Sequence, residues 1–156
     1  MVENHSREIY IYLWRMLRDP QDAEDALQES FIRAFRGFPR LRDDSNLRAW
    51  LYKIATNVAN TQLKKRTRLE SRTVDLNETI LPLSEPIADE DERLTSVLAA
   101  VESLPSKQRT ALLLRNYQGF DYPVIAKILN CSEDSARANV YQAVKKLRKL
   151  FVEETS

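Results

Sequence analysis

The chain has 156 residues, with 24 Lys and Arg against 23 Asp and Glu, which gives a formal net charge of +1. That length allows one ordinary domain or two very small ones. Only 2 Gly and 6 Pro occur in a chain that is 43% hydrophobic, which disfavours a turn-rich β fold. Long segments repeat apolar residues at helical spacing, so we predict an all-α protein.

The single cysteine, Cys131, excludes an internal disulfide. No apolar run approaches the ~18 residues that a membrane span needs, and the polar N-terminus has no signal-peptide pattern. We therefore predict a cytoplasmic protein that does not associate with membranes. Cys131 falls at a predicted turn, and we interpret it as a small buried hydrophobic residue rather than a redox sensor or metal ligand.

The sequence pattern of the N-terminal part of the chain, residues 1–70, predicts three helices. The first covers about residues 6–18. Asp19 as N-cap and Pro20 at the first position begin the second, which runs to about Arg36 with Gly37 as its C-terminal stop. The apolar stripe of the second helix is predicted to comprise Ala23, Ala26, Leu27, Ser30, Phe31, Ala34 and Phe35. Residues 38–45 are predicted to form a loop.

A third helix is predicted from a cap near Asp44 or Ser45 to about Arg68. Its buried face is expected to contain Leu47, Leu51, Ile54, Val58 and Leu63. Its other face carries amides between cations, at Lys53, Asn57, Asn60, Lys64 and Arg68. This pattern suits a nucleic-acid strand, because cations bind phosphates and amides read bases. The preceding loop adds Arg40 and Arg42, and could hold a base pulled out of the stack. A solvated helix face is the plainer alternative.

The second helix exposes a different kind of surface, which we call the acidic strip: Asp22, Asp25, Gln28, Glu29, Ile32 and Arg36. Acidic side chains make a poor surface for DNA and a suitable one for a basic protein partner. Part of the acidic character is also explained by the favourable position of carboxylates at a helix N-terminus.

Between about residues 69 and 90, apolar residues no longer recur at helical spacing. The segment 71–94 contains 2 Lys and Arg against 7 Asp and Glu, whereas the blocks before and after it are mildly basic. We predict an acidic, flexible tether between two domains, with a loop packed on one domain as the alternative.

The C-terminal block predicts a helix-turn-helix. One helix opens at Pro105 and stops at Gly119. A second is capped by Asp121, and Asn130 fits the left-handed conformation of the tight turn. Ser132 can cap the third helix, which would enter the DNA major groove. Its buried face is predicted to contain Ala136, Val140, Ala143, Leu147 and Phe151, and its outer face Arg137, Ala138, Tyr141, Gln142, Lys145 and Arg148.

Three segments carry a family resemblance. Asp22–Phe35 resembles the core-polymerase-binding helix of extracytoplasmic-function (ECF) sigma factors, and Leu47–Asn57 resembles their promoter-melting helix. Leu104–Arg115 followed by Gly119–Ser132 resembles sigma domain 4. The absence of another domain between the two blocks matches the minimal two-domain sigma type of the sigma-70 superfamily.

The resemblance implies a fold of two small helical domains: sigma domain 2 over residues 1–69 and sigma domain 4 over residues 93–153, joined by an acidic linker over 70–92. It implies a transcription initiation factor, not an enzyme, with no catalytic residue, metal or cofactor. The implied partners are core RNA polymerase, through its β′ clamp coiled coil and its β-flap, promoter DNA, and an anti-sigma factor. The chain is expected to be a monomer outside the holoenzyme.

The resemblance also assigns sites. The acidic strip would dock on the polymerase. The melted −10 element would be read by Arg40, Arg42, Asp43, Ser45, Asn46, Lys53, Asn57, Asn60 and Lys64. The −35 duplex would be read by Arg115, Arg137, Ala138, Tyr141, Gln142 and Lys145. The third helix of the helix-turn-helix, which we call the recognition helix, departs from the family pattern because it begins with Glu133 and Asp134. These two carboxylates repel phosphate, so Arg137 and Gln142 become the preferred base contacts.

Two other classes of function are alternatives. A stand-alone helix-turn-helix regulator would explain the C-terminal block but would leave the acidic strip and the amide-cation face without a role. A nucleic-acid enzyme would need clustered carboxylates aimed into a cleft, often with His, whereas the only histidine, His5, lies near the N-terminus.

Overall fold

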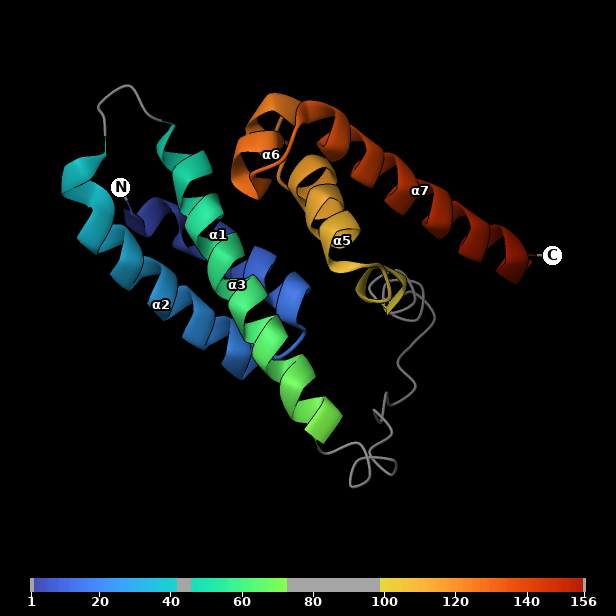
Figure 1. The fold of residues 1–156 in the computed structure, drawn as a ribbon, viewed down its shortest axis with the longest axis horizontal. Helices are drawn as coiled ribbons and strands as arrows, with labels where there is room; N and C mark the ends of the chain where they lie inside the picture. Colours follow the sequence, from blue (N-terminus) through green and yellow to red (C-terminus); the bar gives the residue numbers. More distant parts are fainter. Residues whose placement is uncertain (1, 42–45, 73–98, 156) are drawn as a thin grey trace.

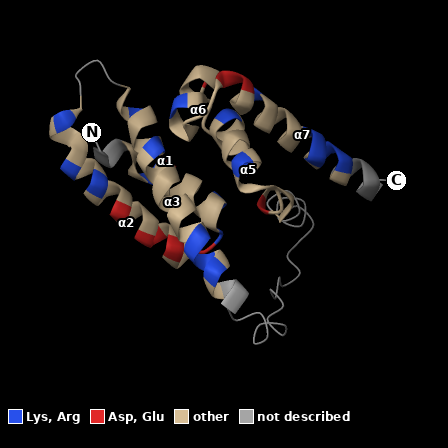
Figure 2. Ribbon diagram, viewed as in Figure 1, with Lys and Arg blue, Asp and Glu red and all other residues tan. Residues whose placement is uncertain are grey.

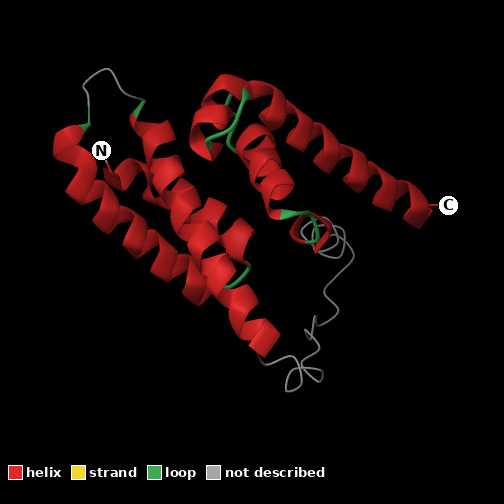
Figure 3. Ribbon diagram, in the orientation of Figure 1, coloured by secondary structure: helices red, strands yellow, loops and turns green. Residues whose placement is uncertain are grey.

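The computed structural model describes residues 2–41, 46–72 and 99–155, and the side chains of 5–41, 46–69 and 99–150 (Figure 1). Throughout this part of the chain the elements are helical, with no strand (Figure 3). The elements are α1 (Val2–Leu17), α2 (Pro20–Gly37), η1 (Phe38–Arg40), α3 (Leu47–Arg72), α5 (Ser106–Leu112), the π-helical η2 (Leu113–Tyr117), α6 (Tyr122–Leu129) and α7 (Glu133–Thr155). The all-α prediction is confirmed. Residues 69–72, which were expected to belong to the tether, continue helix α3. The rest of the predicted tether, from residue 73 onward, lies outside the described residues.

Helices α1, α2 and α3 pack against one another and form the N-terminal domain. The predicted boundary between α1 and α2 is confirmed. Arg18 adopts a left-handed φ of 56° after α1, and the Asp19 carboxylate accepts hydrogen bonds from the backbone N–H groups of Gln21 (2.8 Å) and Asp22 (3.1 Å). These bonds satisfy donors that the first turn of α2 leaves free.

Four details of this domain differ from the sequence prediction. Helix α2 ends at Gly37 as predicted, but not through a left-handed conformation, because the φ of Gly37 is −88° and the chain continues into η1. The glycine is needed for space instead: a Cβ there would lie 3.1 Å from a ring carbon of Trp50. The cap of α3 is Asn46, whose side-chain oxygen accepts from the Ala49 N–H at 3.1 Å. Helix α3 ends at Arg72 rather than near Arg68.

The fourth difference is Phe35, which was predicted to be buried and is 83% exposed. Helical geometry explains the error, because Ala34 is buried and each further residue turns by about 100° around the helix axis. Phe35 therefore points away from the core. Ala23, Ala26 and Ser30 are buried as predicted.

The core of this domain contains a buried hydroxyl chain. Tyr12 Oη lies 2.7 Å from Thr56 Oγ1, and the Thr56 hydroxyl donates to the Tyr52 carbonyl oxygen at 2.7 Å. Tyr12, Tyr52 and Thr56 are all at most 1% exposed. Burial raises the pKa of Tyr12 far above its ordinary value, so the phenol stays neutral and donates to Thr56.

We expect Thr56→Val to destabilise the protein more than Tyr12→Phe. The valine leaves the Tyr12 hydroxyl buried without an acceptor, at a cost of about 1–3 kcal/mol, whereas the phenylalanine removes that hydroxyl and costs about 1 kcal/mol. Urea unfolding of both variants measures the difference. A Thr56→Val protein at least as stable as Tyr12→Phe would contradict this account of the core.

Helices α5, α6 and α7, with η2, form the C-terminal domain. Gly119 has a φ of 73° and Asn130 a φ of 53°, and Ser132 Oγ accepts from the Ser135 N–H at 3.0 Å. These are the turn residues and the cap that a helix-turn-helix needs, so that prediction is confirmed. The Asp121 side chain makes no capping bond, contrary to the prediction; its Oδ1 lies 3.5 Å from Arg115 Nη1.

The two domains contact each other directly. Helix α3 packs against α6, and these segments lie side by side in Figure 1. One continuous hydrophobic core runs through both domains, and the Tyr52 and Phe120 rings meet across the seam in an edge arrangement with centroids 5.1 Å apart. None of the described helices has both the length and the apolar character to cross a membrane.

Candidate polymerase and nucleic-acid interfaces

The acidic strip lies on one side of α2. Asp25, Gln28, Ile32 and Arg36 are exposed, and Ile32 is a large apolar side chain with 46% of its surface in solvent. Glu29 is half-buried and accepts a hydrogen bond from Arg33 Nε at 3.0 Å. Figure 2 shows acidic residues along the first half of α2 and basic residues along its second half. The strip thus joins negative charge to exposed apolar surface.

One member of the strip has a structural partner. Asp22 is half-buried and forms an ion pair with Arg66 of α3, and Arg66 also donates to the Leu17 carbonyl oxygen at 2.8 Å. Through Arg66, Asp22 therefore links α2 to both α1 and α3. Its carboxylate is less free to bind a partner protein than that of Asp25.

The exposed apolar surface extends beyond the predicted strip. Phe35 is 83% exposed and Phe38 of η1 is 46% exposed. Together with Ile32, they form an apolar end to the acidic strip. Phe35 was expected in the buried stripe, but the register of α2 places Ala34 there instead. Exposed apolar groups at the edge of a polar surface often mark a protein contact.

The amide-cation face of α3 is formed as predicted. Lys53, Asn57 and Lys64 are exposed, and Asn60 is half-buried. Arg40 is exposed in η1 and Asn46 is exposed at the start of α3. The remaining predicted −10 residues Arg42, Asp43 and Ser45 lie outside the described residues. The face therefore presents two amides between lysines on a single rigid helix, an arrangement that can bind a phosphate backbone and bases together.

The aromatic residues of α3 differ from each other in position. Trp50 is half-buried and packs against Gly37. Tyr52 is fully buried, with its ring 5.0 Å from that of Tyr12. Tyr52 therefore belongs to the core and not to the amide-cation face.

The outer face of α7 carries the predicted −35 residues. Arg137, Ala138, Tyr141, Gln142 and Lys145 are all exposed, and Tyr141 has 64% of its surface in solvent. Ala136, Val140 and Ala143 are buried on the opposite face. A shallow cavity of about 490 Å³ lies along the outer face, lined by Tyr122, Arg137, Val140, Tyr141, Val144, Lys145 and Arg148.

Tyr122 brings two predicted −35 residues together. The guanidinium carbons of Arg115 and Arg137 each lie 4.7 Å from the centroid of its ring, a distance at which a cation is attracted to an aromatic face. Arg115 is half-buried and also donates to the Phe120 carbonyl oxygen at 3.2 Å. Tyr122 thus positions cations from η2 and α7 beside one another, although nothing in its sequence position revealed this role.

The acidic start of α7 is close to this basic group. Asp134 Oδ1 lies 3.8 Å from Arg137 Nη1, and both side chains are more than half exposed, so the pair contributes little to stability. Glu133 and Asp134 complement the positive end of the helix dipole. Arg137 remains free to exchange Asp134 for another acceptor.

Comparison with known proteins identifies both domains. The family model described as Sigma-70 region 2 matches residues 1–69, and Sigma-70, region 4, matches residues 94–147. The RNA polymerase sigma-H factor of Pseudomonas aeruginosa is 30% identical over 154 residues, which cover 92% of this chain and 80% of that protein. The ECF RNA polymerase sigma-E factor of Escherichia coli is 31% identical over 133 residues, covering 78% of this chain and 70% of that protein.

Solved structures agree with this result. The sigma factor RpoE of Bartonella quintana, crystallised in complex with the anti-sigma factor NepR, has a TM-score of 0.76 and 25% identity, covering 94% of this chain and 91% of that chain. CnrH in complex with the cytosolic domain of CnrY has a TM-score of 0.71 and shares the fold at 20% identity, covering 97% of this chain and 85% of that chain.

The two family matches occur in order in one chain, so the N-terminal block is part of the same functional unit as the helix-turn-helix. This excludes the stand-alone helix-turn-helix regulator, which would need no region 2. The chain belongs to the extracytoplasmic-function sigma factors of the sigma-70 family, the initiation factors that bind core RNA polymerase and direct it to specific promoters.

Proposed function

We propose that this sigma factor divides its work among three surfaces: the acidic strip of α2 for core polymerase, the amide-cation face of α3 for the −10 element, and the outer face of α7 for the −35 element. The observation that carries this proposal is that the acidic strip, the amide-cation face and the exposed residues Arg137, Tyr141, Gln142 and Lys145 lie on three different helices. We assign residues 1–69 to sigma domain 2, 70–92 to the linker and 93–153 to sigma domain 4.

On α2, we assign polymerase docking to Asp25, Gln28, Glu29, Ile32 and Arg36, and we add Phe35 because of its exposure. The partner surface is the β′ clamp coiled coil. Asp22 acts by fixing α2 against Arg66. The β-flap is assigned to sigma domain 4.

On α3, we assign the melted −10 strand to Lys53, Asn57, Asn60 and Lys64. The lysines would hold phosphates while the amides contact unstacked bases. Arg40, Arg42, Asp43, Ser45 and Asn46, at the entry to α3, complete the proposed site.

On α7, we assign base contacts in the −35 duplex to Arg137 and Gln142, with Ala138, Tyr141, Lys145 and the neighbouring Arg115 completing the site. Arg137 is exposed and held beside Tyr122, so its guanidinium projects from a rigid support. A bidentate contact from arginine to guanine is a common form of specific readout in the major groove.

Replacing Arg137 with Ala tests this assignment. We expect binding of the holoenzyme to −35 duplex to weaken by about 1–3 kcal/mol, with relaxed specificity at one base position. Quantitative footprinting measures the change. Arg7→Ala, which removes an exposed arginine from α1, is the matched control. An unaltered footprint for Arg137→Ala would reject the role of this residue.

The chain is proposed to act by binding alone, without chemistry of its own, because its family consists of initiation factors. We also propose that it works in the cytoplasm, where polymerase and promoter meet, as a monomer outside the holoenzyme. An anti-sigma partner is proposed from the complexes of RpoE with NepR and of CnrH with CnrY.

A further inference from the structure

The seam between the two domains contains a polar cluster that joins α1, α3 and the turn after η2. Arg48 donates from Nε to Glu8 Oε1 at 2.8 Å and from Nη2 to the Gln118 carbonyl oxygen at 2.9 Å. The Tyr52 hydroxyl lies 2.7 Å from Glu8 Oε1 and 2.6 Å from Gln118 Oε1. The cluster therefore links residues of the N-terminal domain to both the backbone and the side chain of Gln118.

Aromatic contacts strengthen the same seam. The Arg48 guanidinium carbon lies 4.3 Å from the centroid of the Phe120 ring, and Phe120 is 5% exposed. Arg48 is thus held by a carboxylate, a carbonyl oxygen and an aromatic face at once. Arginine suits this position, because its planar guanidinium can hydrogen-bond in its plane while stacking on a ring.

The electrostatics of Glu8 fit a carboxylate that stays ionised. Its burial would raise the pKa, but hydrogen bonds from His5, Tyr52 and Arg48, together with the charge of Arg48, lower the pKa below its ordinary value. Glu8 thereby remains a charged partner for Arg48 at neutral pH.

We infer that Glu8, Arg48, Tyr52, Gln118 and Phe120 form an interdomain latch, which holds the free protein in a closed form that cannot occupy a complete promoter. Peripheral contacts lie beside it: Arg15 stacks on Tyr117 at 4.4 Å, and Arg18 Nε lies 3.5 Å from Glu102 Oε2. The consequence for the promoter rests on the −10 and −35 assignments proposed above, whereas the closed form itself does not depend on them.

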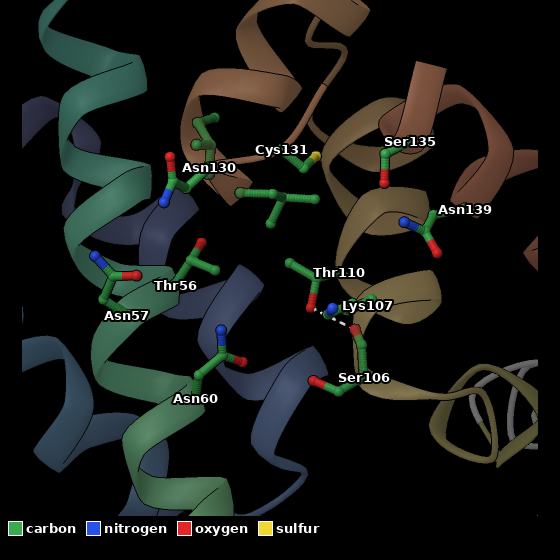
Figure 4. A pocket seen from close by; sticks show the side chains of 12 residues that line it. Thr56, Asn57, Asn60, Ser106, Lys107, Thr110, Asn130, Cys131, Ser135 and Asn139 are labelled. Atoms are coloured by element: carbon green, nitrogen blue, oxygen red, sulfur yellow. Dashed lines mark hydrogen bonds between the residues drawn. The ribbon is translucent and has the colours of Figure 1, made fainter. Parts of the chain in front are cut away.

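The proposed DNA-binding helices are too close together in the closed form. Asn57 and Asn60 of α3 line the same cavity of about 170 Å³ as Ser135 and Asn139 of α7, and Figure 4 shows α3 side chains facing those of α5 across this cavity. The −10 and −35 elements lie roughly 25 base pairs apart, or ~85 Å of B-form duplex at 3.4 Å per pair. The latch must therefore open before both elements can be bound.

The seam also contains a feature that favours opening. Asn60 Oδ1 is buried without a hydrogen-bond partner among the described residues, and it belongs to a residue proposed to contact the −10 strand. An unpaired buried acceptor is unfavourable, and opening would return it to water or offer it to DNA. The closed form is thus held by the latch against a local penalty at the DNA-binding face.

Small-angle X-ray scattering of the free, full-length chain tests the latch. The test variant combines Arg48→Ala with Gln118→Ala. The matched control combines Arg7→Ala with Asn116→Ala, which removes an exposed arginine and an exposed amide from outside the seam. We expect the wild type and the control to have a radius of gyration near the value of about 15 Å for a compact chain of this length.

The test variant should expand to about 20 Å or more, because separated domains no longer scatter as one compact body. Circular dichroism verifies that its helices remain. If the double variant does not fold, Arg48→Ala alone, which removes the bonds to Glu8 and to the Gln118 carbonyl oxygen, carries the same test. A wild-type protein that already scatters as separated domains, or a folded variant as compact as the wild type, would overturn the proposal. Neither result bears on polymerase binding, so the two proposals fail independently.

Discussion

Changing Asp25 and Glu29 together to lysine is expected to weaken binding to core RNA polymerase by at least about 100-fold while the helical fold is retained. Both residues lie on the acidic strip, and truncating or opposing a charge in an interface can cost 2–5 kcal/mol. The only ion pair lost among those described is the one between Glu29 and Arg33, whose side chains are 44% and 46% exposed. Such a pair contributes little to the free energy of unfolding.

Competition binding against a labelled wild-type sigma factor measures this effect. The control reverses two other exposed acids, Glu133→Lys with Asp134→Lys at the start of α7, so that the change in net charge is identical. Normal polymerase affinity for the Asp25 and Glu29 variant would refute the docking face. Equal losses for both variants would show that net charge, and not the acidic strip, governs binding.

Replacing Asn57 and Asn60 with alanine is expected to reduce promoter opening by about 10–100-fold, with recruitment of the holoenzyme to closed promoter DNA changed by less than about threefold. The amides are proposed to contact bases that become unstacked only on melting, and a bidentate contact from an amide to a base is worth about 1–3 kcal/mol. Their loss therefore acts after the duplex has been bound.

Permanganate reactivity of thymines near the start site separates opening from recruitment. Asn116→Ala, which removes an exposed amide from η2, serves as the control. Unchanged permanganate reactivity in the Asn57 and Asn60 variant would exclude these amides from strand capture. A matching loss of recruitment would place their contacts in the closed complex instead.

The local parts of the fold could be predicted from the sequence because their causes are local. Asp19 before Pro20, Asn130 at a tight turn and Ser132 before a helix each impose a backbone conformation within a few residues, and all three occur as predicted. Helix α7 is divided into buried and exposed faces as predicted up to residue 150, since the 3.6-residue period determines both. The side chain of Phe151, predicted on the buried face, lies outside the described residues.

The errors have equally specific causes. Phe35 was placed in the core because it is apolar, although the register of α2 turns it outward; its apolar character suits a partner surface. Helix α2 ends at Gly37 as predicted, but the backbone of this glycine is not left-handed, and what distinguishes the position is the nearby ring of Trp50. That contact joins residues distant in sequence and leaves no local pattern.

The domain seam could not be predicted at all. Arg48 and Gln118 are 70 positions apart, and neither belongs to a periodic or charged pattern that indicates a partner. The chain between them includes residues 73–98, outside the described residues. Only the folded arrangement brings the Arg48 guanidinium to Phe120 and the Tyr52 hydroxyl to Gln118.

The most direct test of the central claim is transcription in vitro by purified core polymerase on a genomic DNA library, with start sites mapped in the presence and absence of this chain. The account predicts start sites that require the chain and that share two upstream sequence elements at a constant spacing, one for each domain. Start sites unchanged by addition of the chain, or a single shared element bound by the helix-turn-helix alone, would contradict it.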